Sequence, residues 1–457
     1  MDIESIIKNT MGKQVISMPS KTDEWLSWYI GNVKDFHHYK AYNGKRKVNC
    51  TRKTLNIAKK ASEDYANLLL NERADVAYGD DEGQQQLWDM LNFVKFWQIG
   101  NEGIEKSFAL GNGALVEGVD ANGNEKLQFV NAKKIYPLTI EDGKITESAF
   151  VNVNSDNLVI QYHFKDDDGL YYIRTQVYKV ISGQNIGELE EDELFETKSK
   201  TAWFQFIRPN IANNIDINSP LGISVFANAL DIAMGIDLAY DGFCEEMRLG
   251  KLRTFVNSRL VRYEDGCETP IFDADDVGFY IMSDNADDTK EPLKFYAPAL
   301  RTDSYMAGVN NGLNLFSSAV GFGQNHYKFD STGLSTATQV VSENSDMFRT
   351  IKKHEILLND VIIDCCRALM YIHNEFTNKP YKFDLEGNIE VKFDDSIIED
   401  KETEKANDRT DVGLGVMSKV QYRMKWFNED EETARANIEA IKQEKQGEMT
   451  DIFSTEE

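Results

Sequence analysis

The residues best suited to chemistry are two neighbouring aspartates, Asp394 and Asp395, which directly follow a strand-like run at 389–393. Two-metal nucleases and other phosphoryl-transfer enzymes bind their metal ions with carboxylates, and aspartates at strand ends suit that purpose. Such a site needs further carboxylates from elsewhere in the chain, and the sequence designates none. The pair is also typical of a cap between a strand and a helix, so the pattern leaves both interpretations open.

The usual signatures of catalysis and metal binding are missing from the sequence. No G-x-x-x-x-G-K-[ST] loop and no G-x-S-x-G turn occurs. His354-Glu355 has no second histidine one turn later, and the six histidines form no set with ligand spacing. We therefore expect no enzyme activity, no metal site and no cofactor, which suggests a component of an assembly. We interpret the five cysteines as buried free thiols: Cys50, Cys244, Cys267, Cys365 and Cys366.

The charge of the chain limits how it can handle a nucleic acid. Its 457 residues include 50 Lys and Arg against 76 Asp and Glu, a net charge of −26. A conventional DNA-binding surface is basic, because its affinity comes from neutralising phosphates. Either nucleic acid is irrelevant to this chain, or the chain handles DNA without gripping it. No run approaches the ~20 apolar residues of a membrane span, and the start lacks a signal-peptide pattern, so we expect a soluble intracellular protein.

A basic stretch near the N-terminus interrupts the acidic background. Residues 43–60 hold seven Lys and Arg residues and no acid. No aromatic residues are interleaved with them, so the stretch does not resemble a single-strand binding platform. It fits a face that pairs with acidic neighbours, in this chain or in the next subunit, and a phosphate contact is the other interpretation. The residues of the proposed inter-subunit patch are Lys45, Arg46, Lys47, Arg52 and Lys53.

Two periodicities divide the N-terminal half of the chain. Apolar residues at helical spacing predict helices over the first ~110 residues. The pattern then changes to strand-like runs separated by turns such as Asp142-Gly143, which predicts an antiparallel meander over 108–180. We interpret residues 186–200 as an acidic loop. The aspartates at 166–168 adjoin a turn glycine, so we interpret them as turn residues and not as a metal site.

The C-terminal half begins with two helices that enclose a small module. Ser219-Pro220 has the residue types of a helix start, and helical spacing continues to near Gly250. Strand-like pieces at 251–298 predict a compact module, and a second helix at 303–322 closes it. Residues 323–335 lack periodicity and predict a loop.

A much longer helix is predicted next, beginning near Ser335. About 38 residues at 1.5 Å each give ~57 Å, enough for a spine that contacts several layers or subunits. Residues 381–384 and 389–393 then predict a hairpin. The tail from 398 is charged and helical, with a break marked by two glycines, at 413 and 415.

Several segments, in this order, carry a resemblance to a known family. The most specific is Gly333-Leu-Ser-Thr-Ala-Thr338 with the run 340–345, followed by Arg349-Thr350 and His354. The others are 110–116 with 135–139, 219–222 with 229–241, and 391–396 with 413–418. Over about residues 50–440 the chain resembles the portal proteins of tailed bacteriophages, in the group typified by siphophages of Gram-positive hosts.

The resemblance implies an α+β portal fold that assembles as a ring, usually of twelve subunits. Each subunit has a mixed wing domain, a two-helix stem, a small α/β clip, a long spine helix and a helical crown. The implied boundaries are 1–219 for the N-terminal helices and wing meander, 220–250 and 299–322 for the stem helices, 251–298 for the clip, 323–337 for the tunnel loop, 338–375 for the wing spine helix, 376–398 for a wing hairpin, and 399–457 for the crown and C-terminal tail.

The resemblance also implies which residues meet DNA and protein partners. Double-stranded DNA passes the tunnel loop, with candidates Gln324, Asn325, His326, Tyr327, Lys328, Phe329, Asp330 and Ser331. The clip docks the terminase large subunit during packaging and a head–tail adaptor afterwards, with candidates Arg259, Arg262, Glu264, Asp273, Asp275 and Asp276.

The implied function is a ring-shaped DNA channel at one vertex of the virion capsid. The terminase packages the genome through it and the genome is later ejected the same way, and the ring also meets the major capsid and scaffolding proteins. It is assembled in the host cytoplasm, with no membrane partner. Two alternatives remain open from the sequence: a metal-dependent nuclease that uses Asp394 and Asp395, and a capsid scaffold component without a channel.

Overall fold

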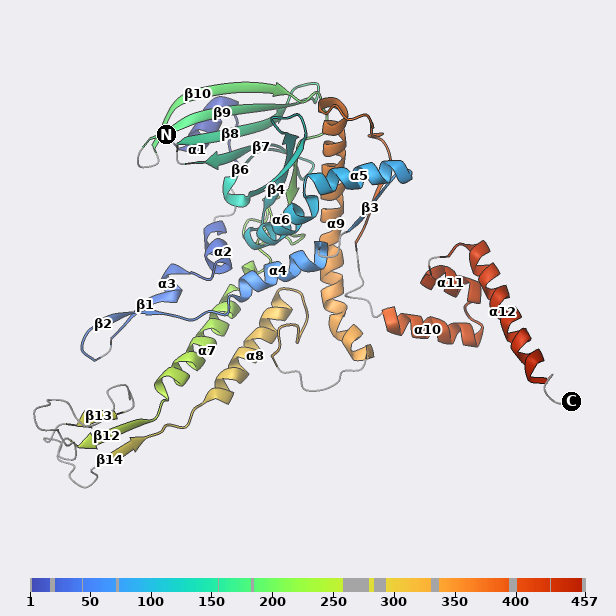
Figure 1. Ribbon diagram of the computed structural model, residues 1–457. Coiled ribbons are helices and arrows are strands. Elements are labelled where there is room, and N and C mark those ends of the chain that lie inside the picture. The colour runs from blue at the N-terminus through green and yellow to red at the C-terminus, as the bar shows by residue number, and fades with distance from the viewer. Residues whose placement is uncertain are drawn as a thin grey trace, which may run out of the picture. The chain divides into compact units, whose positions relative to one another are not determined.

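The computed structural model describes residues 2–16, 21–42, 44–70, 74–154, 156–181, 185–257, 279–282, 293–329, 337–393, 401–427 and 429–453. The chain divides into two units, which are treated separately below. The first comprises Met1–Ser331 and Arg349–Phe393, and the second comprises Thr332–Phe348 and Asp394–Glu457. Helices and strands are mixed along the chain (Figure 1), which confirms the expected α+β class.

A five-stranded antiparallel sheet is the largest sheet of the first unit. Its order is β10-β9-β8-β7-β6, so every strand pairs with its neighbour in sequence. The predicted meander is confirmed from residue 135 onward, but the hairpin with which it was expected to begin, β4–β5, lies in another sheet. Helix α1 (Ile3–Met11) covers one face with Ile6 and Ile7, which pack on Leu158, Ile160 and Tyr162. The strands are β6 (Ile135–Glu141), β7 (Lys144–Val153), β8 (Asn157–Lys165), β9 (Tyr171–Ile181) and β10 (Asn185–Glu196).

The prediction of an acidic loop at 186–200 is wrong, because most of that segment forms the edge strand β10. Its many glutamates do not prevent pairing, since an edge strand exposes its side chains to solvent. Asp192 also binds Arg174 of the neighbouring strand, with Oδ2 2.6 Å from Nη2. The turn at 166–169 is as predicted, because the amides of Asp168 and Leu170 donate to the Asp166 carboxylate.

A second, three-stranded antiparallel sheet has the order β11-β4-β5. A core cluster that joins the two sheets includes Val116 and Phe204 from this sheet and Phe150 from β7. The hairpin β4–β5 turns at residues 120–124, as the sequence predicts. The strands are β4 (Gly113–Val119), β5 (Glu125–Asn131) and β11 (Phe204–Ile207), and a 3-10 turn, η1 (Ala132–Lys134), leads from β5 into β6.

The first 110 residues are mainly helical, as expected, but they also contain a hairpin that the sequence analysis missed. Strands β1 (His38–Tyr42) and β2 (Lys47–Thr51) pair antiparallel in five registered positions. Apolar residues do alternate in both strands, with Tyr39 and Ala41 on β1 facing Cys50 and Val48 on β2, but each run is only five residues long and is rich in polar residues. The helices are α2 (Thr22–Tyr29), α3 (Lys34–His37), α4 (Ile57–Leu70), α5 (Asp81–Phe93) and α6 (Phe96–Leu110).

Two further helices and a small sheet follow β11. Helix α7 (Leu230–Leu249) leads to strands β12 (Arg253–Asn257), β13 (Phe279–Met282) and β14 (Leu293–Tyr296), and α8 (Thr302–Ala319) follows them. The described strands pair in the order β13-β12-β14, parallel for β12–β13 and antiparallel for β12–β14. A short 3-10 turn, η2 (Ala227–Ala229), precedes α7.

The predicted helix start at Ser219-Pro220 is wrong, because α7 begins only at Leu230. Long-range hydrogen bonds hold the preceding backbone in a non-helical path. The amide of Gly222 donates to Asn112 Oδ1 at 2.9 Å, and the amide of Val225 donates to the Phe108 carbonyl at 2.9 Å. These partners lie more than 100 residues away, so the local start signal could not reveal them.

The long helix is confirmed as α9 (Ala337–Phe376), 40 residues against about 38 expected. From Arg349 onward it belongs to the first unit, where Ala368 and Ile372 pack on Trp203. Cys365 and Cys366 are buried free thiols, whereas Cys50 and Cys244 are half-buried. Cys267 lies outside the described residues.

The hairpin predicted at 381–384 and 389–393 is also wrong. Strand β15 (Ile389–Lys392) pairs antiparallel with β3 (Asp75–Tyr78), some 300 residues earlier. The amides of the other segment bind side chains instead of a strand: Phe383 N donates to Asn374 Oδ1 and Asp384 N donates to the Tyr78 hydroxyl, both at 2.8 Å.

The second unit contains the helical tail that the sequence predicts. Its helices are α10 (Lys401–Leu414), α11 (Lys419–Phe427) and α12 (Glu431–Phe453). Gly415 follows α10 with φ +76°, which places the break where the two glycines predicted it. Asp408 of α10 accepts from the indole of Trp426 at 2.8 Å, so α10 and α11 are joined.

Candidate functional site

The helices α7 and α8 form an antiparallel pair in which two glycines leave room for side chains of the facing helix. A Cβ atom at Gly242 would lie 2.5 Å from the ring of Tyr305, and one at Gly312 would lie 2.7 Å from Ile236. Such contacts allow no larger residue without a shift of the neighbour. Glycine at these two positions therefore sets how closely the two helices approach.

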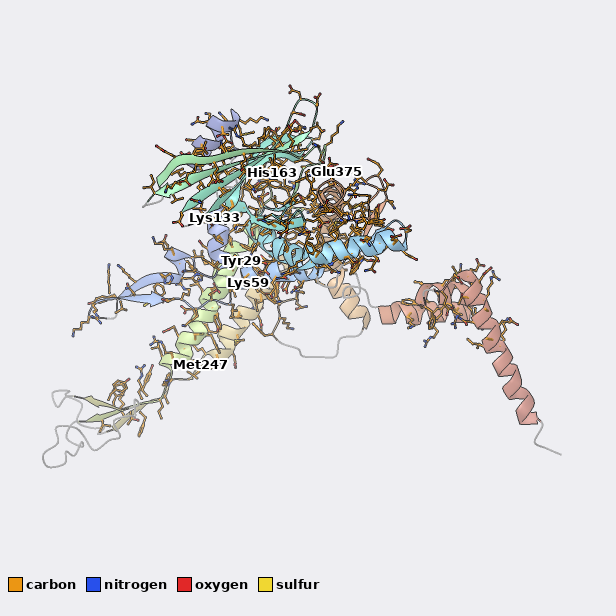
Figure 2. The ribbon with its side chains drawn as sticks, turned by 45° about the horizontal axis from the view of Figure 1, so that its top comes forward. Tyr29, Lys59, Lys133, His163, Met247 and Glu375 are labelled. Carbon is orange, nitrogen blue, oxygen red and sulfur yellow. The ribbon has the colours of Figure 1, made fainter. Side chains whose placement is uncertain are left out.

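A charged contact closes the pair at the end next to the β13-β12-β14 sheet. Nη2 of Arg301 lies 2.8 Å from Glu246 Oε2, and its backbone amide and Nε also donate to that carboxylate. Met247, near this end of α7, is labelled in Figure 2 and is largely exposed. This ion pair holds the end of α7 next to the start of α8.

The helix pair is acidic. Helix α7 carries five carboxylates and one arginine, and α8 carries one carboxylate and no base. Most of its length is partly exposed, including Leu238 and Leu315. Of these carboxylates, Asp237 and Asp241 are buried, while Glu245 and Glu246 pair with arginines, so the exposed surface of the pair is only weakly acidic.

Two carboxylates of α7 hold the segment that leads from β2 to α4, and we call this set of contacts the carboxylate clamp. Asp237 accepts from the amide of Leu55 at 2.9 Å and from His37 Nε2 at 3.1 Å, and both side chains are buried. Asp241 accepts from the amide of Lys53 at 3.0 Å. Since the two aspartates lie one turn apart, they share one face of the helix.

The orientation of His37 follows from its other hydrogen bond. Its Nδ1 accepts from the amide of Val33 at 2.8 Å, so Nε2 carries the proton that Asp237 accepts. Trp28 and Phe36 pack on the ring, with centroids 5.6 and 5.0 Å away. The clamp thus fixes α3 and the start of α4 to the same helix.

The segment after α8 turns back on α4 before it becomes exposed. The hydroxyl of Tyr65 donates to the carbonyl of Val320, and its ring lies 4.5 Å from that of Phe322. His354 of α9 packs on the other side of Tyr65, at 5.1 Å, and burial lowers the pKa of its imidazole to about 3. Three elements thus hold the base of the predicted tunnel loop.

Asp64 contributes a polar contact to the same base. Its Oδ2 lies 3.8 Å from His326 Nε2, and Lys60 also pairs with it. Burial opposes ionisation of Asp64, but hydrogen bonds from His326 and Lys60 outweigh it and lower the carboxyl pKa. Burial and the nearby Asp64 raise the pKa of the Tyr327 hydroxyl.

The structure divides the eight candidate loop residues into three groups. His326 and Tyr327 face the body of the protein, where Tyr327 also donates its amide to Ser317 at 3.2 Å. Four others are exposed, namely Gln324, Asn325, Lys328 and Phe329; His326 is exposed as a whole residue too, although its side chain is only 25% exposed. The last two candidates, Asp330 and Ser331, lie outside the described residues.

The five residues of the proposed basic patch also differ in their contacts and exposure. Arg52 lies 3.7 Å from Asp241 and stacks on Phe36, and Lys53 joins the carboxylate clamp through its amide. Lys59, labelled near Tyr29 in Figure 2, binds Glu63 at 2.8 Å and approaches Glu105 at 3.4 Å. The other three members are exposed on the β1–β2 hairpin: Lys45, Arg46 and Lys47.

Two predicted groups cannot be placed. The six clip candidates, at 259, 262, 264, 273, 275 and 276, lie outside the described residues, and so do Asp394 and Asp395. Within the described ranges, no three His, Cys, Asp or Glu residues come together as a metal site. In the same part of the chain, no helix is both long and apolar enough to cross a membrane.

Two clefts and a strongly perturbed carboxyl group involve residues of the sheets and of α9. A cleft of about 200 Å³ is lined by His163 and Gln161, and another of about 120 Å³ by Arg208 and Asp360. Neither includes a residue of α7 or α8. Burial raises the pKa of Glu117 on β4 to about 8. We expect this carboxyl group to affect the stability of the fold and not to belong to a functional site.

The sequence analysis missed the residues that organise this region: His37, Asp64, Tyr65, Asp237 and Asp241. The two α7 aspartates did leave a signal, because they fall on the buried stripe of an otherwise apolar helix face. A carboxylate there needs a partner. The sequence could not name the partner, since Leu55 and Lys53 donate through the backbone.

The family comparison matches almost the whole chain. The family described as phage portal protein, SPP1 Gp6-like, matches residues 20–451. No curated protein matches the chain at a significant level.

Solved structures that resemble the chain are distant in sequence. One is described as the neck of a native GTA particle computed with C12 symmetry, with 11% identity, a TM-score of 0.43, and coverage of 92% of this chain and 97% of that chain. Another, the virion of a native gene transfer agent particle, has 10% identity, a TM-score of 0.42 and the same coverage.

Proposed function

The chain belongs to the SPP1 Gp6-like family of phage portal proteins, and from this premise we propose that its copies form a closed ring around a channel for double-stranded DNA. The observation that carries the proposal is the match to this family over residues 20–451. The expected ring has twelve subunits and occupies one vertex of the virion capsid, after assembly in the host cytoplasm. In a cyclic ring, one face of each subunit meets a different face of the next.

The helix pair supports the assignment of a stem. In this assignment α7 and α8 are the stem helices, and the small sheet between them in sequence is the clip. Their close antiparallel packing, with Gly242 against Tyr305, suits a rigid wall. The Arg301–Glu246 bridge at the sheet end would keep the clip in a fixed relation to the stem.

The acidic stem suits a channel that must release DNA as readily as it admits it. Binding of duplex DNA is dominated by neutralisation of phosphates, and a tightly bound duplex could not slide. The exposed carboxylates of α7 and α8, such as Asp231 and Asp303, work against such binding. The net charge of −26 therefore fits passage of DNA better than capture.

The exposed part of the tunnel loop is proposed to meet the duplex. Lys328 supplies a positive charge for brief phosphate contacts, and Phe329 is 61% exposed beside it. His326 and Tyr327 are assigned to the base of the loop, because Asp64 and α8 hold them. This division narrows the DNA-facing set to Gln324, Asn325, Lys328 and Phe329, with Asp330 and Ser331 following in sequence.

The remaining partners follow from the family assignment. The clip would dock the terminase large subunit during packaging and a head–tail adaptor afterwards, through the candidates at 259–276. The wing would meet the major capsid and scaffolding proteins. The family is a structural component of the particle, and we propose that this chain has no enzymatic activity and that the separate terminase drives packaging.

The alternatives from the sequence gain no support. A nuclease at Asp394 and Asp395 and a scaffold without a channel both conflict with membership of a portal family. Magnesium-dependent DNA cleavage that is lost in Asp394→Ala would overturn the proposal in favour of the first.

A packaging assay with loop variants tests the channel function. We expect Lys328→Glu with Phe329→Ala to reduce packaged DNA per particle, because both residues lie in the exposed part of the loop. Lys200→Glu is the charge-matched control, since Lys200 is exposed on another part of the chain. Both variants should still form rings. Packaged DNA equal to wild type in the loop variant, with rings intact, would contradict a DNA-facing role for the loop.

A further inference from the structure

The β1–β2 hairpin is fixed at its root and exposed at its tip. At the root, the carboxylate clamp holds His37 before β1 and the amide of Lys53 after β2. Arg52 adds to it, because its guanidinium lies 4.3 Å from the Phe36 ring and 4.8 Å from the Tyr39 ring. The hairpin therefore extends from a rigid base on α7.

The paired strands have no third strand beside them. Among the described residues, β1 and β2 form a separate two-stranded sheet. A lone two-stranded hairpin is marginally stable in water, and this one exposes Tyr42 at 68%. A partner that covers the ladder would bury this ring and stabilise the hairpin.

The hairpin has the opposite charge to the rest of the molecule. Residues 38–51 contain four Lys and Arg residues and no acid, in a chain of net charge −26. The rest of the chain thus carries −30, and a second copy offers the acidic surface that the hairpin complements. The four bases, all exposed, are Lys40, Lys45, Arg46 and Lys47.

The position of the hairpin suits a contact between copies. In Figures 1 and 2 it leaves α7 on the side away from α8. Five residues per strand at ~3.3 Å give a reach of about 16 Å, more than the 8–10 Å between the axes of packed helices. An arm of this length on the free flank of α7 can reach a neighbouring stem.

We propose that the β1–β2 hairpin docks on an acidic surface of a second copy of the chain and helps to hold adjacent subunits together. The proposal rests on the ring of the proposed function and adds the segment and residues that make the contact. Duplex DNA is the other acidic partner of suitable size. A second copy is favoured because the exposed Tyr42 needs a covering surface, and because the clamp holds the arm on the stem flank.

Photo-crosslinking identifies the occupant directly. Tyr42 is replaced by the photoreactive residue p-benzoylphenylalanine in full-length protein, and ¹⁴N- and ¹⁵N-labelled chains are mixed before assembly, with duplex DNA present. We expect mixed-isotope crosslinks in mass spectra, from position 42 to peptides of another copy. Crosslinks only within one chain, crosslinks to DNA, or no crosslink in intact rings would each overturn the proposal.

Charge reversal measures the contribution of the basic tip. Lys45→Glu, Arg46→Glu and Lys47→Glu together should raise the protein concentration needed for ring formation roughly tenfold, and added salt should raise it for wild type, because these are charge contacts at a partly exposed interface. The control reverses three exposed wing lysines: Lys126, Lys179 and Lys200.

The two proposals fail in distinguishable ways. If the tip variant and the control form rings at the same concentration, the hairpin contact is wrong and the ring stands. If wild-type protein forms no ring under any condition, including in particles, the proposed function itself is wrong.

Discussion

His37 and Asp237 form a buried hydrogen bond, with Nε2 3.1 Å from Oδ2, that joins the N-terminal segment to helix α7. The residues are 200 positions apart in sequence. Asp237 accepts a second bond from the Leu55 amide, so both of its oxygens are used. The start of α4 and the root of the hairpin therefore depend on one carboxylate of the stem.

Removal of the Asp237 carboxylate should destabilise the protein. In Asp237→Ala the buried His37 Nε2 and the Leu55 amide lose their acceptor, which costs about 2–4 kcal/mol for two unsatisfied donors. We expect a thermal midpoint lowered by several degrees and faster proteolysis near residues 37–55. Asp231→Ala, in the exposed first turn of the same helix, is the control. Equal midpoints for the two variants would show that the clamp is not a stabilising contact.

Protonation of Glu125 in acid should lower the stability of the folded protein. Burial alone would raise the pKa of Glu125, but hydrogen bonds from His373 and Lys379 outweigh it and lower the pKa to about 2. Stability from this carboxylate is present above its unfolded pKa of about 4.5 and is lost as pH falls towards 2. Glu125→Gln should therefore be less stable than wild type at pH 7, with a difference that shrinks in acid.

Thermal unfolding between pH 7 and 3 measures this difference. Glu102→Gln is the control, because Glu102 is 56% exposed. A Glu125→Gln variant whose deficit is the same at pH 7 and pH 3 would rule out the carboxylate as the source of the effect.

Ionisation of Glu117 should lower the stability of the folded protein as the pH rises. Burial raises its pKa to about 8, so the folded protein holds a proton there that the unfolded chain has released above pH ~4.5. Stability is then lost as pH rises from about 4.5 through 8. We expect Glu117→Gln to remove part of this loss, so that it unfolds at a higher temperature than wild type at pH 8.5. A variant less stable than wild type at pH 8.5 and equal to it at pH 5 would contradict the assignment.

Substitution at the base of the predicted tunnel loop should lower the stability of the protein, whereas substitution in its exposed part should lower the amount of packaged DNA. Tyr327 packs near Phe316 and Phe322, with ring centroids 6.1 and 6.0 Å away. Tyr327→Ala should cost about 2 kcal/mol of stability, less than the loss of a fully buried ring, because Tyr327 is half-buried. Lys328→Ala should change stability by less than about 0.5 kcal/mol yet reduce packaged DNA. Thermal unfolding and packaging yield, measured on both variants, test this separation, and the reverse pattern would contradict it.

Much of the fold was accessible from the sequence where local signals and tertiary structure agree. The helical spacing of α9 and the turns at 142–143 and 168–169 predict their elements well, because side-chain periodicity and turn residues are local properties. The helix break near Gly415 was predictable for the same reason, because the glycine signal is local.

The errors arise where distant partners decide the backbone. Ser219-Pro220 has the composition of a helix start, yet Asn112 and Phe108 hold the following residues in an extended path. Strand β15 pairs with β3 and not with the segment at 381–384. The acidic strand β10 lacks apolar alternation, so no sequence period marks it, and the alternation in β1 and β2 spans only five residues in each strand.

In the candidate site, too, the sequence predicts the local features and not the contacts with distant residues. The sequence places the loop after α8 correctly, and Lys328 is exposed there as the loop prediction requires. It could not show that Tyr65 and Asp64 hold the base of that loop, since these residues lie more than 250 positions earlier. Nor could it show that Arg52 lies against Asp241 and Phe36, whereas Lys45 is exposed on the hairpin.

Electron cryomicroscopy of the purified, assembled protein tests the central claim most directly. The account predicts a closed ring of identical copies with an open axis, lined by the acidic helices α7 and α8, and with Lys328 facing the opening. Monomers with no ring, both in solution and in assembled particles, or a ring whose axis is filled by protein too narrow for a duplex, would contradict it.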